Sequence, residues 1–301
     1  MPPSYSPAMR IVTLLPAATE IVAALGAGTE LVGISHECDW PAHLADRPRV
    51  TTTPVDPEAH GAAIDAQVRL LRESGRPVIA VDGRQLHALA PDLIITQGLC
   101  DVCAVIDGEV HHLAAALDPA PRVLSLTATD LSGIWGDIRA VAAALGRESA
   151  AETLIARQQR RLAALGETRG ATRPRVVCIE WLEPLYLAGH WVPDLVAMAG
   201  GEDVGARAGS HSAVRPWQEI SALAPDLILV VLCGMSLERA RRELAAVTDA
   251  DVLSLLSERP TWLLDGNAYT SRPGPRVVDG AERIQAALEG RTMDGLERWR
   301  A

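Results

Sequence analysis

The chain of 301 residues contains no phenylalanine and no lysine, so arginine and histidine are its only basic side chains. The 38 acidic residues outnumber the 28 basic ones, and the formal net charge is -10. Nucleic acids and anionic membranes attract basic surfaces. The composition therefore argues against both kinds of partner.

The sequence also lacks long apolar runs. A bilayer-spanning helix needs ~20 consecutive apolar residues, but the run that begins at Ile11 is interrupted by Pro16 and Glu20. Residues 1–9 carry no basic side chain, and a secretion signal needs a basic stretch before its apolar one. We therefore expect no membrane insertion and a cytoplasmic location.

Cysteine is scarce, and the five cysteines form an odd number. Small secreted proteins with a disulfide framework usually have an even number of them. We expect reduced thiols, which are typical of a reducing compartment.

A heptapeptide that occurs twice organises the chain. Ala88–Ile94 and Ala222–Ile228 both read Ala-Leu-Ala-Pro-Asp-Leu-Ile. Proline ends a helix, and the apolar residues after it predict a buried parallel strand. The two copies lie too far apart for a solenoid, whose repeats are ~20–50 residues long. The repeat therefore predicts two α/β lobes of one design.

The elements around the repeats set the predicted domain boundaries. We expect an N-terminal lobe over residues 9–128, a linking helix region over 129–170, a C-terminal lobe over 171–290 and a tail over 291–301. Gly146 is a candidate break in the linking helix, and residues 51–81 resemble an insertion. Residues 180–186 and 266–275 are predicted loops of the C-terminal lobe. Ligands in such folds bind at the carboxyl ends of strands, where loops of this kind lie.

Five segments resemble the helical-backbone family of periplasmic binding proteins, which serve ABC importers for cobalamin, heme and siderophores. They are Leu14–Glu20, Gly33–Ser35, the two Pro-Asp-Leu-Ile strands and Ser271–Arg276. The likeness extends from about Arg10 to Leu288. It implies an α/β fold of two Rossmann-like lobes, with parallel sheets flanked by helices, joined by a long rigid helix, and a ligand held in the cleft.

Three further segments resemble a signal-less subgroup of cobalamin-binding proteins: Ser35–Pro41, Gln97–Val105 and Leu187–Pro193. This resemblance implies a corrinoid, or a related tetrapyrrole or metal chelate, as a ligand that is bound without turnover. An ABC importer component is one alternative. A cleft enzyme or metal-binding protein that uses His36, Glu180 and a cysteine or bound metal is another.

His36, Cys38, Cys100 and Cys103 are candidate metal ligands, because they lie on two loops that each follow a predicted strand. Imidazole and thiolate suit zinc and other transition metals. Cys100 and Cys103 also have the spacing of a redox pair. Small buried residues that pack a loop would give the same pattern. In the corrinoid interpretation, His36 instead offers a nitrogen to cobalt.

A large flat macrocycle requires aromatic walls and a few polar anchors. The candidate ligand-binding residues are His36, Trp40, Glu180, Trp181, Glu183, His190, Trp191, Asn267, Tyr269 and Arg272. Tryptophans also fill cores, and Trp217 and Trp262 are the ones we assign there. His190 has the alternative role of capping the helix after it.

In the importer family, as the resemblance implies, each lobe docks on the permease through a surface glutamate. Counting back from the heptapeptides places Arg84 and Gln218 at these positions. Arginine facing the arginines of a permease would repel them. Permease docking is therefore doubtful on the sequence alone.

Overall fold

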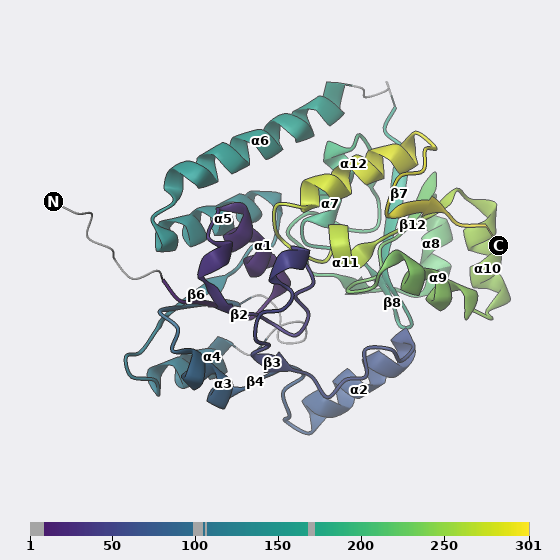
Figure 1. Ribbon diagram of the computed structural model, residues 1–301. Helices are drawn as coiled ribbons and strands as arrows, with labels where there is room; N and C mark the ends of the chain where they lie inside the picture. The colour runs from purple at the N-terminus through teal and green to yellow at the C-terminus, as the bar shows by residue number, and fades with distance from the viewer. Residues whose placement is uncertain (1–8, 99–104, 106, 168–171, 301) are drawn as a thin grey trace. The chain divides into compact units, whose positions relative to one another are not determined.

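The computed structural model describes residues 9–98, 105, 107–167 and 172–300 (Figure 1). Contacts within the chain define two compact units. The N-terminal unit comprises residues up to 56, 67–127 and 136–154, and the C-terminal unit comprises 57–66, 128–135 and 155 onwards.

The N-terminal unit is built on a four-stranded sheet in which all neighbours are parallel. In spatial order its strands are β2 (Leu31–Gly33), β1 (Ile11–Thr13), β5 (Leu93–Gln97) and β6 (Arg122–Leu126). Its helical elements are α1 (Pro16–Ala24), η1 (Gly28–Glu30), η2 (Ala42–Leu44), α3 (Gly83–Leu89) and α4 (Asp107–Ala115). β1 and most of β5 are buried, as central parallel strands are.

The predicted insertion contains a two-stranded antiparallel pair and a helix. The pair is β3 (Thr51–Thr52) with β4 (Ala80–Val81), and the helix is α2 (Gly61–Glu73). Residues 57–66, which include the start of α2, belong to the C-terminal unit. The insertion is therefore shared between the two units.

The C-terminal unit contains a seven-stranded mixed sheet. In spatial order it runs β10 (Ala213–Val214), β8 (Leu185–Leu187), β7 (Arg175–Leu182), β11 (Leu227–Val230), β12 (Thr261–Leu264) and β13 (Leu296–Arg298), and β9 (Glu202–Asp203) pairs with β7. β7, β11 and β12 are parallel to one another, whereas β8, β10 and β13 pair in antiparallel fashion. The predicted α/β lobe with a parallel sheet flanked by helices is confirmed, and its edge strands add antiparallel pairs.

Six helices accompany this sheet: α7 (Val192–Met198), α8 (Trp217–Ala222), α9 (Leu237–Ala245), α10 (Ala250–Glu258), α11 (Gly266–Tyr269) and α12 (Val277–Leu288). One hydrophobic cluster of the core joins β7, β11 and β12 to α9 and α10. Trp262 is 2% exposed and Trp217 packs against the cluster, so both take the core positions assigned from the sequence.

The predicted linking helix is two helices, α5 (Leu131–Leu145) and α6 (Glu148–Glu167). Gly146 lies between them with a positive φ of 64°, a conformation that glycine adopts at low cost. No helix among the described residues has the length and apolarity that a membrane span requires.

The two heptapeptides adopt the same local structure, as the repeat predicts. Each follows a short helix, α3 or α8, passes through an alanine with positive φ, and enters a buried parallel strand, β5 or β11. The alanines are Ala90 (φ 39°) and Ala224 (φ 44°). A left-handed residue after a helix is a common way to end it.

The same arginine–aspartate arrangement fixes both copies to the preceding strand. The Arg10 backbone N–H donates to Asp92 Oδ2 at 2.8 Å, and the Arg175 N–H donates to Asp226 Oδ2 at 2.8 Å. Each guanidinium also donates to carbonyl oxygens at the end of the helix, for example Arg10 to Leu89. The two lobes therefore share a design at the level of individual hydrogen bonds.

One predicted loop is a strand. Residues 180–182 continue β7, and Leu182 pairs with Leu185 across a tight turn into β8. The loop prediction is wrong because β7 continues by pairing with β8, and Pro184 lies in the turn between the two strands. The sequence reasoning also missed α10 and the strand β13 in the predicted tail.

Candidate functional site

In the N-terminal unit, the loop after β2 carries His36 and Cys38. Arg49 fixes this loop, because its guanidinium donates to the carbonyl oxygens of Ser35, Cys38 and Ala45. The loop is thus held by a cation and three backbone acceptors, and its side chains are preorganised.

The hydrogen bonds of His36 determine its tautomer. Thr51 Oγ1 donates to Ser35 Oγ at 3.1 Å, which uses its only proton. His36 Nδ1 lies 2.7 Å from the same oxygen and must therefore donate to it. Nε2 then keeps its lone pair, the arrangement found in metal-binding histidines. Burial, and secondarily Arg49, lower the pKa of His36, which favours the neutral imidazole.

Cys38 is buried, and its Sγ lies 3.0 Å from Thr19 Oγ1. Cys100 and Cys103 fall outside the described residues. Within the described part of the chain, no group of three or more His, Cys, Asp or Glu side chains is placed to hold a metal ion. The predicted four-ligand metal site thus remains a prediction.

Trp40 is 48% exposed, although it is a large apolar side chain. It lies four residues beyond His36 on the loop that Arg49 fixes. The carboxyl end of β2 therefore carries an accessible aromatic surface and an imidazole nitrogen with a lone pair.

In the C-terminal unit, Glu180 lies on β7 near its carboxyl end. Its Oε2 accepts a short hydrogen bond from Ser212 Oγ, and Ser212 Oγ accepts one from the Gly189 N–H at 3.1 Å. The Cys233 N–H donates to the Glu180 carbonyl oxygen at 3.0 Å. Glu180 therefore joins three loops at this end of the sheet.

Trp181, the next residue, is covered by the segment of the insertion that belongs to this unit. A Cβ on Gly61 would lie 3.4 Å from the indole, so the two are in contact. Glu243 on α9 accepts from the Gly61 N–H at 3.0 Å, and Arg239 donates to the Ala59 carbonyl oxygen at 2.6 Å. These bonds hold the segment in place, and one part of the indole is closed to ligands.

His190 and Trp191 occupy the turn before α7. The Trp191 Nε1–H donates to the Thr270 carbonyl oxygen at 2.7 Å, and Trp191 is buried. His190 is half-buried, and its Nε2 lies 3.3 Å from His211 Nδ1. Burial, and secondarily His211, lower the pKa of His190.

The loops after β11 and β12 are bonded to each other. The Asn267 N–H donates to the Met235 carbonyl oxygen, and the Gly234 N–H donates to Ser271 Oγ, each at 3.0 Å. Arg272 is 5% exposed and donates to Asn267 Oδ1 at 2.8 Å. A buried guanidinium at this edge of the sheet is a preorganised cationic group.

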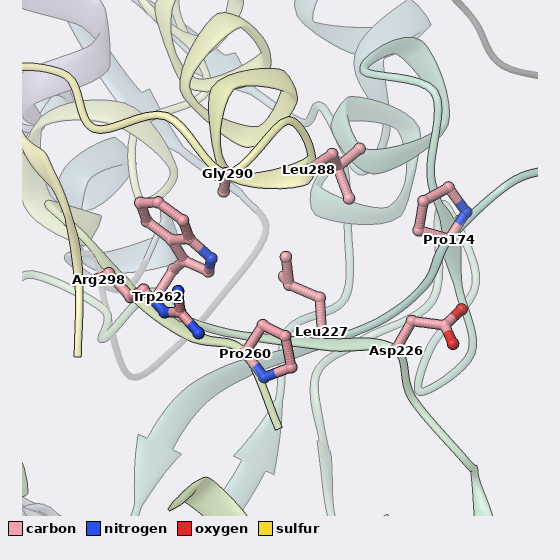
Figure 2. Close-up of a pocket in the computed structure, with 9 residues that line it drawn as sticks. Pro174, Asp226, Leu227, Pro260, Trp262, Leu288, Gly290 and Arg298 are labelled. Carbon is pink, nitrogen blue, oxygen red and sulfur yellow. The ribbon is translucent and has the colours of Figure 1, made fainter. Parts of the chain in front are cut away.

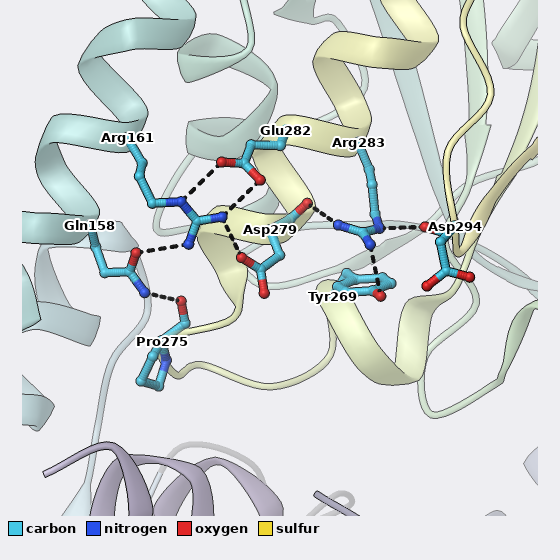
Figure 3. A network of polar contacts seen from close by, with 8 residues as sticks. All are labelled: Gln158, Arg161, Tyr269, Pro275, Asp279, Glu282, Arg283 and Asp294. Carbon is cyan, nitrogen blue, oxygen red and sulfur yellow. Dashed lines mark hydrogen bonds and ion pairs between the residues drawn. The ribbon is translucent and has the colours of Figure 1, made fainter. Parts of the chain in front are cut away.

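Tyr269 belongs to a structural network rather than to an open surface (Figure 3). The Arg283 guanidinium lies 3.7 Å from the ring centroid and donates to the phenol oxygen at 2.9 Å. Burial raises the pKa of this phenol. Its predicted role in ligand binding therefore competes with a packing role.

The same network ties α6 to α12. Arg161 donates to Asp279 at 2.6 Å and to both carboxylate oxygens of Glu282, and Gln158 donates to the Pro275 carbonyl oxygen at 2.9 Å (Figure 3). These contacts fix the chain just after Arg272.

The candidate residues thus divide into three groups, of which the first is His36 and Trp40 on the loop after β2. The second group lies at the carboxyl ends of β7, β11 and β12, where hydrogen bonds connect the loops; its members are Glu180, Trp191, Asn267 and Arg272. Glu183 is exposed in the β7–β8 turn. Sequence reasoning missed Arg49, Thr51, Ser212 and His211, because their roles come from contacts with residues distant in the sequence.

A cavity of about 320 Å³ lies elsewhere, at the amino ends of β7, β11 and β12 (Figure 2). Its lining includes Pro174, Leu227, Pro260 and Trp262. Ligands of open α/β sheets bind at the opposite ends of the strands. We therefore assign the candidate site to the carboxyl-end loops and not to this cavity.

Asp203 is a buried carboxyl group beside β7. Its Oδ1 accepts from the backbone N–H groups of Gly205 (2.9 Å) and Ala206 (3.0 Å), and the carboxyl group also interacts with the Cys178 thiol. Burial raises the pKa of Asp203 to about 6. The folded protein therefore holds this proton at pH values where the unfolded chain has lost it.

This pKa predicts a specific dependence of stability on pH. The unfolded carboxyl ionises near pH 3.9, so the free energy of unfolding should fall by up to ~3 kcal/mol as the pH rises from about 4 to above 6. Asp203→Asn cannot ionise and should lack this contribution. Urea unfolding at pH 4.5 and pH 7.5 checks it, and an equal pH dependence in parent and variant would contradict it.

Two α/β units with matching strand–turn–helix designs, and polar loops at the carboxyl ends of their strands, define a ligand-binding protein of the two-lobed class. The chain belongs to the periplasmic binding protein family, which matches residues 11–262. No significant match is found among curated proteins.

Several solved structures share the fold. The periplasmic heme-binding protein HutB of Vibrio cholerae is 20% identical, with a TM-score of 0.68 over 94% of this chain and 99% of HutB. RhuT, a periplasmic heme-binding protein from Roseiflexus sp. RS-1, is 22% identical, with a TM-score of 0.67 over 94% of this chain and 99% of RhuT. The vitamin B12-binding protein BtuF of Vibrio cholerae is 19% identical, with a TM-score of 0.62 over 94% of this chain and 97% of BtuF.

Proposed function

We propose that the protein binds a corrinoid, or a related tetrapyrrole or metal chelate, without catalytic turnover. The observation that carries the proposal is the contact of His36 Nδ1 with Thr51 Oγ1 at 2.7 Å, from which we infer the tautomer. Its Nδ1 donates to Thr51, and its Nε2 lone pair is directed away from that bond. An imidazole nitrogen fixed in this way is a good ligand for the cobalt or iron of such a molecule.

Aromatic and polar side chains at the carboxyl ends of the strands are of the kinds that bind a macrocycle. The exposed indole of Trp40 offers an apolar face. In the C-terminal unit, Arg272 donates to Asn267, and side chains of these two kinds bind amide and carboxylate groups. BtuF and HutB are named as binding proteins for vitamin B12 and heme, which belong to this chemical class.

A cytoplasmic location is part of the proposal. The described cysteines, Cys38, Cys178 and Cys233, are free thiols, as expected in a reducing compartment. Cys178 is buried, and burial raises its pKa well above the usual value, so it stays protonated. This thiol does not suit the nucleophile of the alternative, a cleft enzyme.

The importer alternative can be tested at the two predicted docking positions. Arg84 and Gln218 are exposed, and each is the second residue of its helix, α3 and α8. The two helices are therefore in the same register relative to the heptapeptides. Neither position carries the glutamate expected of an importer component.

We predict that the protein does not bind a cobalamin-type permease in nanodiscs. An arginine in place of a glutamate replaces attraction with repulsion, which can cost several kcal/mol at an interface. The variant Arg84→Glu/Gln218→Glu should gain saturable binding, measured by surface plasmon resonance. Saturable binding by the parent that Arg84→Glu fails to strengthen would restore the importer interpretation.

Native mass spectrometry with metal analysis, on protein purified under reducing conditions, tests the proposed ligand. The expected adduct has the mass of one corrinoid or heme-like molecule and contains cobalt or iron. Zinc alone, at one ion per chain and lost in Cys100→Ser, would support the metal-binding alternative instead.

A further inference from the structure

We propose that His190 and His211 form a two-imidazole chelate for a divalent first-row transition metal ion of the cobalt-to-zinc series. The site lies in the C-terminal unit and does not depend on the corrinoid proposal. Both histidines are accessible, since His190 is half-buried and His211 is exposed. Imidazole is the nitrogen ligand that these ions prefer in proteins.

The spacing of the two rings fits a shared ion. His190 Nε2 and His211 Nδ1 are 3.3 Å apart. An ion at ~2.05 Å from each nitrogen would subtend about 107° between them, close to the tetrahedral angle. If each ring centroid lies ~3.2 Å from the ion, this angle places the two centroids about 5.2 Å apart. The observed distance between the His190 and His211 ring centroids is 5.2 Å.

The backbone brings the two histidines together at some cost. His190 has φ = 53°, an uncommon conformation for a residue with a Cβ. Two hydrogen bonds hold His190 against the loop that carries His211. The His190 N–H donates to the Ser210 carbonyl oxygen at 2.6 Å, and the Gly209 N–H donates to the His190 carbonyl oxygen at 3.0 Å. Such conformations concentrate at functional sites.

Gly189, next to His190, and Ser212, next to His211, also hold the two loops close together. A Cβ on Gly189 would lie 2.3 Å from the Ser210 carbonyl oxygen, so the loops meet this closely only with glycine there. Ser212 binds both the Gly189 N–H and the Glu180 carboxylate. The residues next to His190 and His211 are thus locked, and the pair is preorganised.

The described residues contain no cluster of three or more potential protein ligands. Water or the donor atoms of a small ligand would fill the other coordination positions of the ion. A direct hydrogen bond between the two rings is the competing explanation of the contact. That explanation predicts no metal affinity at the pair.

The test is a calorimetric titration of the protein with Ni²⁺, and with Zn²⁺ in parallel, in a Cys100→Ser/Cys103→Ser background that removes the competing thiols. The variants are His190→Asn and His211→Asn, because asparagine tolerates a positive φ. His111→Asn is the matched control: His111 is exposed on α4 and lies 3.5 Å from Asp107. Circular dichroism establishes that each variant is folded.

We expect one ion per chain. Each histidine variant should weaken binding at least tenfold, because loss of an outer partner alone costs 10–100-fold. The affinity of the double variant for the metal ion should be little lower than that of either single variant. His111→Asn should bind the ion as tightly as the background protein. Absence of 1:1 binding up to 1 mM metal, or affinity within twofold of the background in His190→Asn or His211→Asn, would overturn the proposal.

Discussion

Replacing His36 by alanine should abolish the visible spectral change that occurs when the protein binds cobinamide, a corrinoid with an open axial position. The reason is that Nε2 of His36 has its lone pair available while Nδ1 is held by Thr51. Coordination of an imidazole changes the ligand field of cobalt and therefore its absorption. Difference spectroscopy during a titration measures both the spectral change and the affinity.

Thr51 is a positioning residue, because its hydroxyl group orients His36. Its substitution should therefore change the affinity for the ligand. Thr51→Val keeps the shape but loses the hydroxyl that orients His36, so affinity should fall 10–100-fold. Thr51→Ser keeps the hydroxyl and should behave like the parent. His87→Ala, at an exposed position on α3, is the control for loss of a histidine elsewhere. An unchanged spectrum and affinity in His36→Ala would remove His36 from the site.

Gly189→Ala should strongly destabilise the C-terminal unit. The new Cβ would lie 2.3 Å from the Ser210 carbonyl oxygen and 2.7 Å from the Ser212 nitrogen, both backbone atoms. The loops must separate, which breaks the Gly189–Ser212 bond and disturbs the anchor of Glu180. Overpacking of this kind costs about 3 kcal/mol, which corresponds to a decrease of ~5–10 °C in melting temperature.

Gly136→Ala is the matched control, because a Cβ there meets no atom within 4 Å and the residue lies inside α5. Alanine favours a helix by ~1 kcal/mol over glycine, so this variant should melt at the same or a higher temperature. Differential scanning fluorimetry compares the two. A decrease in Gly136→Ala as large as that in Gly189→Ala would show that the close approach of the loops is not the cause.

The repeat made the fold predictable from the sequence. Two identical heptapeptides specify helix end, turn and strand, and the structure gives both the same Arg–Asp hydrogen bonds. The break at Gly146 was also predictable, since glycine accepts a positive φ. The continuation of β7 through Trp181 was not, because it depends on pairing with β8 rather than on local preference.

The site was less predictable, for a physical reason. Loop position identified His36, Glu180 and His190 as candidates, but it could not identify what orients them. Thr51 lies 15 residues from His36, and Ser212 lies 32 residues from Glu180. Such partners come together only on folding, and no local pattern in the sequence marks them.

The most direct measurement of the central claim is a titration of the purified protein with cobinamide and, separately, with hemin, followed by tryptophan fluorescence and visible absorbance. The account predicts saturable 1:1 binding of at least one of them at micromolar concentrations or below, weakened at least tenfold in His36→Ala. Absence of saturable binding of both ligands, by a protein shown to be folded, would contradict it.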